Sequence, residues 1–380
     1  MRVTQKIVSK SADFAAQMPG LAAINPDLLI VFGSLAHFSS PNFADSLRAG
    51  LPGTALIGCS TAGEITADGV DDNTCTLTAI KLESSTLIQA NTVLTGMDDS
   101  FASGQRLGKQ LAATGLKAVL VFGPGVQING SALVDGISSI IGSSIPITGG
   151  LAGDGGAFKQ TFTLGPDGVR DNAIVAIGLC GDGLSFGHGS FGGWEPFGPA
   201  RKVTRCANNV LFELDGEPAL EVYKRYLGDH AKDLPASGLL FPFAMLGEDH
   251  NAIGLIRTIL GIDEASGSLT LAGEIDPSGY LKLMHASTDK LVNGAEAAAE
   301  AATTMLNNPG ESLAILVSCV GRKLVMGNRV DEEVEAVGEV LGNKTILTGF
   351  YSYGEISPFT PGASCKLHNQ TMTITCISET

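Results

Sequence analysis

Basic residues are scarce in this chain: 24 lysines and arginines stand against 39 aspartates and glutamates, giving a net charge of −15. Nucleic acids and anionic membrane surfaces require a cationic face, so this balance disfavours both as partners. No run approaches the roughly 18 apolar residues that cross a bilayer. The first residues also lack the apolar stretch of a signal peptide. We therefore expect a soluble cytoplasmic protein.

Metal-binding and disulfide patterns are also missing. The seven cysteines contain no Cys-x-x-Cys pair, and their odd number favours reduced thiols. The six histidines show neither His-x-x-His nor His-x3-His spacing, which disfavours zinc. Covalent haem is excluded because there is no Cys-x-x-Cys-His. Noncovalent haem needs one axial histidine in an apolar pocket, and the candidates are His37, His188 and His368, each in a motif loop at a predicted strand end.

The chain does contain a repeated peptide. Residues 54–65 and 345–356 match at six of twelve positions, and each reads as an apolar strand that enters a glycine-containing turn ending on Glu64 or Glu355. A looser copy at residues 147–154 ends on Asp154. Duplicated units usually share a core and bring equivalent turns to corresponding places. The turns are therefore candidate ligand-binding segments.

The surroundings of the three turns repeat as well. Apolar strands precede them at residues 28–32, 118–122 and 313–317. Threonine-rich or apolar strands follow them near residues 73–80, 172–177 and 369–376. Helical patterns lie near residues 10–23, 42–49, 100–114, 131–141, 289–307 and 331–341. The continuous apolar strands predict burial on both faces, and the alternating threonine-rich ones predict an antiparallel or mixed edge. At 380 residues and 44% hydrophobic content, we expect repeated α/β sandwich units with mixed sheets in two domains, 1–220 and 221–380.

Backbone N–H groups and side chains at these turns could hold a polar or zwitterionic ligand. Alternatively, the glycines only permit tight turns and the carboxylates cap nearby backbone. Arg322, just after an apolar strand, could bind a ligand carboxylate or form a salt bridge with Glu64 or Glu355. The candidate ligand-binding residues are Gly58, Ser60, Thr61, Gly63, Glu64, Gly149, Gly150, Asp154, Arg322, Tyr351, Tyr353 and Glu355.

Two enzymatic or nucleotide interpretations are weaker. The glycines between Gly150 and Gly156 suggest a dinucleotide loop, but the following residues predict a hairpin instead of the required helix. Cys59 follows a strand at a sharp turn, as a nucleophile does, but no histidine is near it in sequence, and a packed thiol is the better interpretation. A hydrolytic reaction through Cys59 or Ser60 is retained only as an alternative, and we expect no catalytic site.

Several motifs together resemble the FIST family, an N-terminal FIST domain followed by a FIST C domain. They lie at residues 58–64, 148–154, 194, 209–219, 318–322, 350–355 and 368–371. The resemblance implies a sensory protein that binds a small ligand, such as an amino acid, and regulates a histidine kinase or a cyclic-di-GMP enzyme. A subgroup binds haem and senses nitric oxide, which is the second hypothesis. Ligand identity and a possible homo-oligomer are left open.

Overall fold

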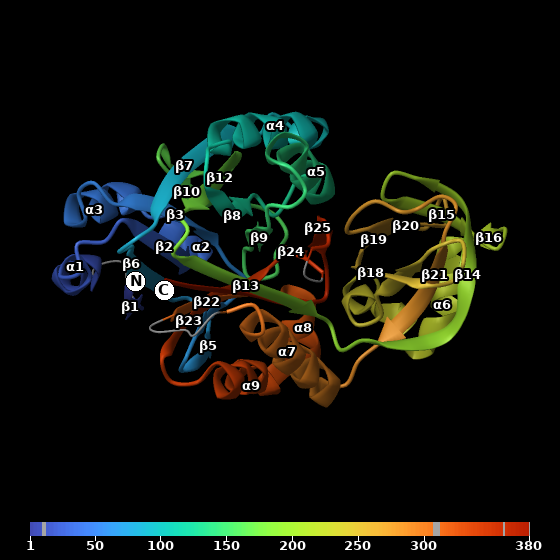
Figure 1. The fold of residues 1–380 in the computed structure, drawn as a ribbon. Helices are drawn as coiled ribbons and strands as arrows, with labels where there is room; N and C mark the ends of the chain where they lie inside the picture. Colours follow the sequence, from blue (N-terminus) through green and yellow to red (C-terminus); the bar gives the residue numbers. More distant parts are fainter. Residues whose placement is uncertain (10–12, 307–311, 360–361, 380) are drawn as a thin grey trace.

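The computed structural model describes residues 1–9, 13–306, 312–359 and 362–379. A large body holds both termini, and a smaller lobe lies at the right of Figure 1. The body contains three six-stranded sheets and the lobe one eight-stranded sheet. The two termini lie side by side, and the Met1 amino group forms an ion pair with Glu379 at 3.2 Å.

The body consists of three units with the same element order: strand, helix, strand, helix, strand, hairpin, strand. The first unit contains β1 (Arg2–Val8), α1 (Phe14–Ala22), β2 (Leu28–Gly33), α2 (Leu35–Phe38), α3 (Phe43–Gly50), β3 (Ala55–Ser60), β4 (Glu64–Thr66), β5 (Gly69–Asp71) and β6 (Cys75–Lys81). The second contains β7 (Thr86–Val93), the 3-10 helix η2 (Met97–Asp99), α4 (Ser100–Leu111), β8 (Leu116–Gly123), α5 (Gly130–Ile141), β9 (Ile147–Leu151), β10 (Thr163–Gly165), β11 (Gly168–Arg170) and β12 (Ala173–Cys180). The third contains β13 (Leu184–Phe191), α7 (Thr288–Thr303), β22 (Ser312–Cys319), α8 (Val320–Met326), the 3-10 helix η5 (Gly327–Arg329), α9 (Asp331–Leu341), β23 (Thr345–Ser352), β24 (Gly354–Pro358), β25 (Cys365–His368) and β26 (Met372–Glu379).

These bounds confirm the predicted duplication, and each predicted helix is present within the described residues. Residues 10–12 and 307, at the ends of two predicted helices, lie outside them. The hairpin predicted after the second turn is present as β10–β11.

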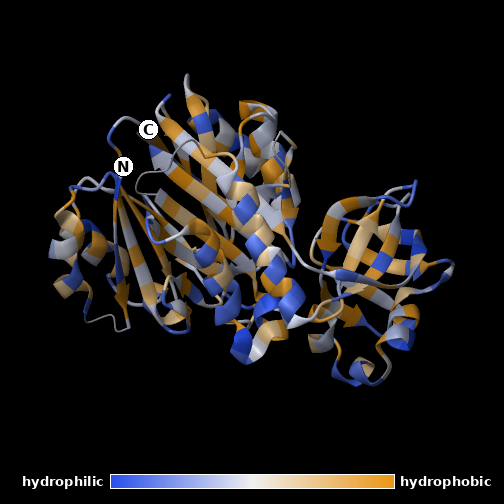
Figure 2. Ribbon diagram, turned by 60° about the horizontal axis from the view of Figure 1, so that its bottom comes forward, coloured by the Kyte–Doolittle hydropathy of each residue, from blue (hydrophilic) through white to orange (hydrophobic). Residues whose placement is uncertain are grey.

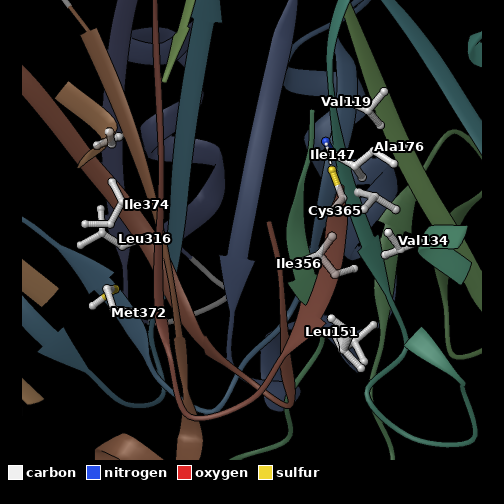
Figure 3. Close-up of a cluster of buried hydrophobic side chains, with 14 of the residues drawn as sticks. Val119, Val134, Ile147, Leu151, Ala176, Leu316, Ile356, Cys365, Met372 and Ile374 are labelled. Carbon is white, nitrogen blue, oxygen red and sulfur yellow. Dashed lines mark hydrogen bonds between the residues drawn. The ribbon is translucent and has the colours of Figure 1, made fainter. Parts of the chain in front are cut away.

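Each unit completes the sheet of another unit with its hairpin. The strand orders are β1-β6-β2-β3-β10-β11, β7-β12-β8-β9-β24-β25 and β13-β26-β22-β23-β4-β5. The hairpins thus pass from the second unit to the first, from the third to the second and from the first to the third. Figure 3 shows the consequence for packing: Ile356 and Cys365 of the third unit lie among Val119, Ile147 and Ala176 of the second.

The central strands are buried on both faces, as their continuous apolar runs predict. Along β2, Ile30 and Phe32 face a core shared by all three sheets, whereas Leu29 and Val31 face α1 and α3. The same alternation holds in β8 and β22, where every second residue joins the shared core. Figure 2 shows apolar residues concentrated along the strands and hydrophilic ones on the helices. The three sheets therefore enclose one common interior, with helices outside.

The prediction that the threonine-rich strands form a sheet edge is wrong. β6 is antiparallel as expected but lies between β1 and β2, and β26 lies between β13 and β22. Both threonine hydroxyls of β6 are buried, and each has a hydrogen-bond partner. Thr76 Oγ1 donates to Phe32 O at 3.3 Å, and Thr78 Oγ1 donates to Thr348 Oγ1 at 3.0 Å. In these strands the alternation of threonine with apolar residues therefore distinguishes a polar face from an apolar face, and both faces are buried.

The lobe is inserted into the third unit, between β13 and α7. Its elements are β14 (Glu195–Ala207), β15 (Val210–Leu214), β16 (Glu217–Pro218), α6 (Ala219–Leu227), the 3-10 helices η3 (Gly228–Asp233) and η4 (Ala236–Leu239), β17 (Phe243–Leu246), β18 (Ala252–Arg257), β19 (Ile259–Asp263), β20 (Ser268–Leu271) and β21 (Tyr280–His285). The strand order is β18-β17-β21-β14-β15-β20-β19, so β18 and β19, which are consecutive in sequence, lie at opposite ends of the sheet. A division of the chain at residue 220 falls inside the lobe, at the start of α6.

Candidate functional site

The three repeated turns contact one another. Backbone hydrogen bonds join each pair of turns, among them Gly153 N to Ser60 O (2.8 Å), Ala62 N to Tyr351 O (2.9 Å) and Tyr353 N to Leu151 O (3.1 Å). Turns that are distant in sequence are therefore held together by backbone, as equivalent parts of one arrangement.

The repeated glycines at these turns have a packing reason. A Cβ atom at Gly58, Gly149 or Gly349 would lie 1.8, 2.0 or 2.0 Å from a carbonyl oxygen of the preceding parallel strand. No side chain fits at such a distance, so the close approach of two strands requires glycine at each position. This requirement alone explains why the three copies keep this residue.

The centre between the turns is filled by aromatic rings. The centroid of Phe32 lies 5.3 Å from that of Phe122 and 4.6 Å from that of Phe350, and the other pair is 5.8 Å apart. All three rings are fully buried. Neither of the two cavities described below is lined by Gly58, Gly149 or Gly349.

Glu64 and Glu355 have matching hydrogen bonds. Glu64 accepts from the Thr61 hydroxyl and from Thr74, through the backbone N–H at 2.9 Å and the hydroxyl at 2.7 Å. Glu355 accepts from Ser352 Oγ at 2.6 Å and from Thr371, through N–H at 3.2 Å and the hydroxyl at 3.0 Å. Each carboxyl group thus ties its turn to the residue just before the last strand of its unit.

Both of these carboxyl groups are almost completely buried. Burial raises the pKa of Glu64 to about 7 and that of Glu355 to about 8, although their hydrogen bonds act in the opposite direction.

Asp154 is bonded differently. It accepts from the backbone N–H groups of Phe158, Lys159 and Gln160 at 2.8, 2.8 and 3.0 Å, and from the Tyr353 hydroxyl. Burial alone would raise the pKa of Asp154, but these donors lower it. The Tyr353 ring stacks on Phe158, with centroids 4.0 Å apart and an angle of 14° between the planes. Phe158, which follows the second turn, and Tyr353, from the third, therefore form a stacked aromatic pair.

Arg322 forms a structural ion pair, and its partner is neither Glu64 nor Glu355. Its side chain is fully buried and contacts Glu333, with Nη2 2.7 Å from Oε2. It also donates to the backbone oxygens of Gly192 and Leu291. Gly192 precedes the inserted lobe and Leu291 follows it, so Arg322 links the two segments through which the chain enters and leaves the lobe. Glu333 in turn accepts from the Tyr351 hydroxyl and from Ser318 Oγ.

The three candidate histidines do not fit an axial haem ligand. His37 bonds Ser34 Oγ at 2.9 Å, and His368 Nε2 lies 2.9 Å from Ser357 O. His188 is buried in β13, and burial lowers its pKa, as it does for the other two. Axial ligation needs a ring nitrogen that faces an open apolar pocket. None of the six histidines, all within the described residues, lines either cavity.

Cys59 and Ser60 are both buried. Burial raises the pKa of the Cys59 thiol far above its usual value, which opposes thiolate formation. Ser60 Oγ donates to Gly153 O at 2.7 Å and accepts from Phe162 N at 2.9 Å. Both hydrogen bonds of this hydroxyl hold neighbouring turns together.

A cavity of about 800 Å³ lies between body and lobe. The body contributes the loop 125–130, Phe101, Phe158, Tyr353, Leu367 and Asn369, and the lobe contributes Asn208, Asn209, Leu239, Leu260 and residues 271–274, among others. Across it, Asn129 Nδ2 donates to Glu274 Oε1 at 2.9 Å. The walls are mainly apolar, with several amide groups.

Of the predicted ligand-binding residues, only Tyr353 lines this cavity. Ligand contact by the others stays a prediction. Sequence reasoning did not select Asn369, which lies within the motif at residues 368–371, or Asn129, which caps α5. A second, more polar cavity of about 610 Å³ lies beyond Val126 and Gln127 and is lined by Lys159, Asp171 and Asn172 among others.

The described residues contain no cluster of three or more His, Cys, Asp or Glu side chains arranged to hold a metal ion. None of their helices has the length and apolar character needed to cross a membrane.

Comparisons with known proteins agree with the motifs. An uncharacterized protein of Methanocaldococcus jannaschii is 36% identical over 93 residues, which are 23% of this chain and 17% of that protein. A crystal structure of a cyanuric acid hydrolase from A. caulinodans covers 99% of both chains with 8% identity, but its TM-score of 0.37 is too low to support an argument.

Family models match almost the whole chain. The FIST N domain matches residues 27–217 and the FIST C domain matches residues 219–358, with a boundary close to residue 220. The chain therefore belongs to the FIST family, whose domains are associated with sensory signal transduction and small-ligand binding.

Proposed function

We propose that this protein is a sensor whose small ligand binds in the cavity between body and lobe. The observation that carries the proposal is the cavity itself: about 800 Å³, mainly apolar, with a few amide groups, and walled by two separate structural units. Ligand sites in proteins typically have this size and composition and occur preferentially between domains.

The position of the cavity offers a route from binding to signalling. Few hydrogen bonds join the two walls: Asn129 to Glu274, Gln370 Nε2 to Leu239 O at 2.9 Å, and Arg257 Nη1 to Leu367 O at 3.4 Å. A ligand that contacts both walls has a different affinity for each arrangement of lobe and body. Such a ligand shifts the population toward the arrangement that it binds better.

The chemistry of the turns supports a binding protein over an enzyme. Cys59 is buried with a raised pKa, and Ser60 already uses its hydroxyl in two structural hydrogen bonds. A nucleophile needs an activating base within hydrogen-bond reach, and neither side chain hydrogen-bonds to a histidine of the described residues. The FIST resemblance supplies the proposed output, regulation of a histidine kinase or cyclic-di-GMP enzyme. That output is tested by adding the protein, with and without ligand, to the candidate enzyme and measuring its rate.

The ligand site is tested by a thermal-shift screen of small metabolites on the intact protein and two matched variants. Ala236→Trp fills the cavity from η4, whereas Ala265→Trp adds the same side chain at an exposed turn of the lobe. A true ligand raises the melting temperature by mass action, worth about 2.7 kcal/mol at a hundred times its Kd. We expect the shift to persist in Ala265→Trp and to disappear in Ala236→Trp. A ligand that stabilises both variants equally contradicts this site.

A further inference from the structure

The cavity has a chemical preference that its family does not specify. Resting on the proposed function above, we propose that it selects a small organic cation, an amine attached to an apolar and preferably aromatic body. Three independent features point to this class: the sign of the charges at the rim, the exposed apolar walls and an amide oxygen with no partner.

The charges at the cavity have one sign. Among the described residues that line it, the charged side chains are Asp98 from the body and Glu274 from the lobe, and both are exposed. Glu274 Oε1 accepts from Asn129, and its carboxylate keeps lone pairs for a further donor. Two carboxylates on opposite sides of an apolar space favour a cation between them and oppose an anion.

The walls fit an apolar body. Met97, Phe101, Phe158 and Leu260 are 49, 43, 37 and 47% exposed, unusually high for large apolar side chains, and all four line the cavity. Exposed apolar side chains that gather in one place mark interaction sites. The stacked Phe158–Tyr353 pair also offers an aromatic face, which attracts ammonium groups.

Asn369 supplies a hydrogen-bond acceptor. The residue lines the cavity and is 2% exposed, and its Oδ1 accepts no hydrogen bond from the described chain. A buried acceptor without a partner costs free energy unless a donor reaches it. Rotation about the last side-chain torsion exchanges the two ends of the amide, so the oxygen can face the cavity and accept from an ammonium or ring N–H group.

One nearby cation works against this selection. The Arg257 side chain is 3% exposed and lies behind Gly273, donating to backbone oxygens of Ile256, Glu274 and Leu367. Because it does not line the cavity, a ligand cannot contact it without displacing the wall. Its charge offsets part of the Glu274 charge, so Asp98→Asn is expected to have the larger effect on binding.

The test is calorimetric titration of the intact protein with four probes of nearly the same shape: tryptamine, indole, tryptophan and indole-3-propionate. We expect tryptamine to bind at least about tenfold tighter than indole-3-propionate, which is about 1.4 kcal/mol. The preference should weaken between about 0.01 M and 0.15 M salt, because the rim carboxylates are exposed. Asp98→Asn and Glu274→Gln should each weaken tryptamine several-fold and leave indole unchanged, and Glu248→Gln, an exposed lobe carboxylate outside the cavity, should change neither.

Each other outcome overturns the inference. Equal or tighter binding of indole-3-propionate refutes cation selection, and tightest binding of tryptophan shows that the site takes a zwitterion. If no probe binds at millimolar concentration, the amine class fails. The proposed function then still stands if a metabolite from the thermal-shift screen stabilises the protein and loses its effect in Ala236→Trp. If neither experiment yields a ligand dependent on the cavity, both proposals fail together.

Discussion

Arg322 is the residue whose removal we expect to cost most stability. Arg322→Met leaves Glu333 charged, fully buried and without its cation, and it removes the donors to Gly192 O and Leu291 O. Breaking a buried pair from one side costs about 3–5 kcal/mol in other proteins. We expect a loss of unfolding free energy in this range, concentrated where the lobe joins the body.

A double-mutant cycle separates the ion pair from the rest. Glu333→Gln keeps an acceptor for Ser318 and Tyr351 but removes the charge. The double variant leaves neither charge buried alone, so its cost should fall below the sum of the single variants by at least about 1 kcal/mol. Arg329→Met is the control, because its ion pairs with Asp289 and Glu332 are exposed to solvent and therefore contribute little to stability.

The assay is denaturant unfolding followed by two signals, far-ultraviolet circular dichroism and tryptophan fluorescence. The single tryptophan, Trp194, packs against Leu291, Met284 and Met326 at this joint and donates to Gln370 O at 2.7 Å. In Arg322→Met the fluorescence transition should move to lower denaturant and precede the dichroism transition. A loss below about 1 kcal/mol, or single variants that add within about 0.5 kcal/mol, would refute the reasoning.

Three further predictions concern the repeated turns and the free thiols. Gly349→Ala places a Cβ atom against a backbone oxygen and should lower the free energy of unfolding by at least about 1–3 kcal/mol. The control Gly338→Ala, in open helical surroundings, should raise it by about 0.5–1 kcal/mol. Equal effects of the two substitutions in thermal or denaturant unfolding would contradict the packing argument. The pKa of Glu355 rises from 4.5 to about 8 on folding, so between these pH values the native state binds more protons than the unfolded state. The free energy of unfolding should therefore fall as the pH increases from about 5 to 8, and it should fall less in Glu355→Gln. Identical pH profiles of the two proteins would contradict this role of Glu355. Six of the seven free cysteines are buried and Cys206 is half-buried, so one thiol should react quickly with a disulfide reagent. Cys206→Ser should remove this fast phase of the reaction. Rapid reaction of Cys59 would instead show that its turn opens.

Sequence periodicity was sufficient for most of the body. The apolar runs at residues 28–32 and 313–317 became central strands because continuous hydrophobicity reports burial on both faces. Threonine misled the prediction for β6, since a threonine that finds a buried partner looks in sequence like one that faces water. The hairpin exchange could not be predicted, because strand pairing between units leaves no mark on the local pattern of either unit.

The candidate site was harder to predict. The three turns were correctly recognised as related. Their repeated glycines, however, are explained by the close approach of strands at Gly58 and Gly349 as well as they would be by a ligand. Arg322 was singled out from its place after an apolar strand, yet its partner Glu333 lies on a helix with no motif of its own. The cavity forms only where the inserted lobe meets the second and third units, so its lining residues come from segments that are distant in sequence.

The exchange of hairpins also has a consequence for biosynthesis. The first hairpin pairs with β23, where Thr66 lies opposite Thr348, so its final neighbour is translated almost last. Until then the nascent first unit keeps an unpaired strand, and its own sheet awaits β10 from the second unit. Pairing between such distant segments is slow, because the closure entropy of the chain opposes it. A ribosome-bound chain that stops before residue 345 should therefore remain open to proteases at residues 64–71.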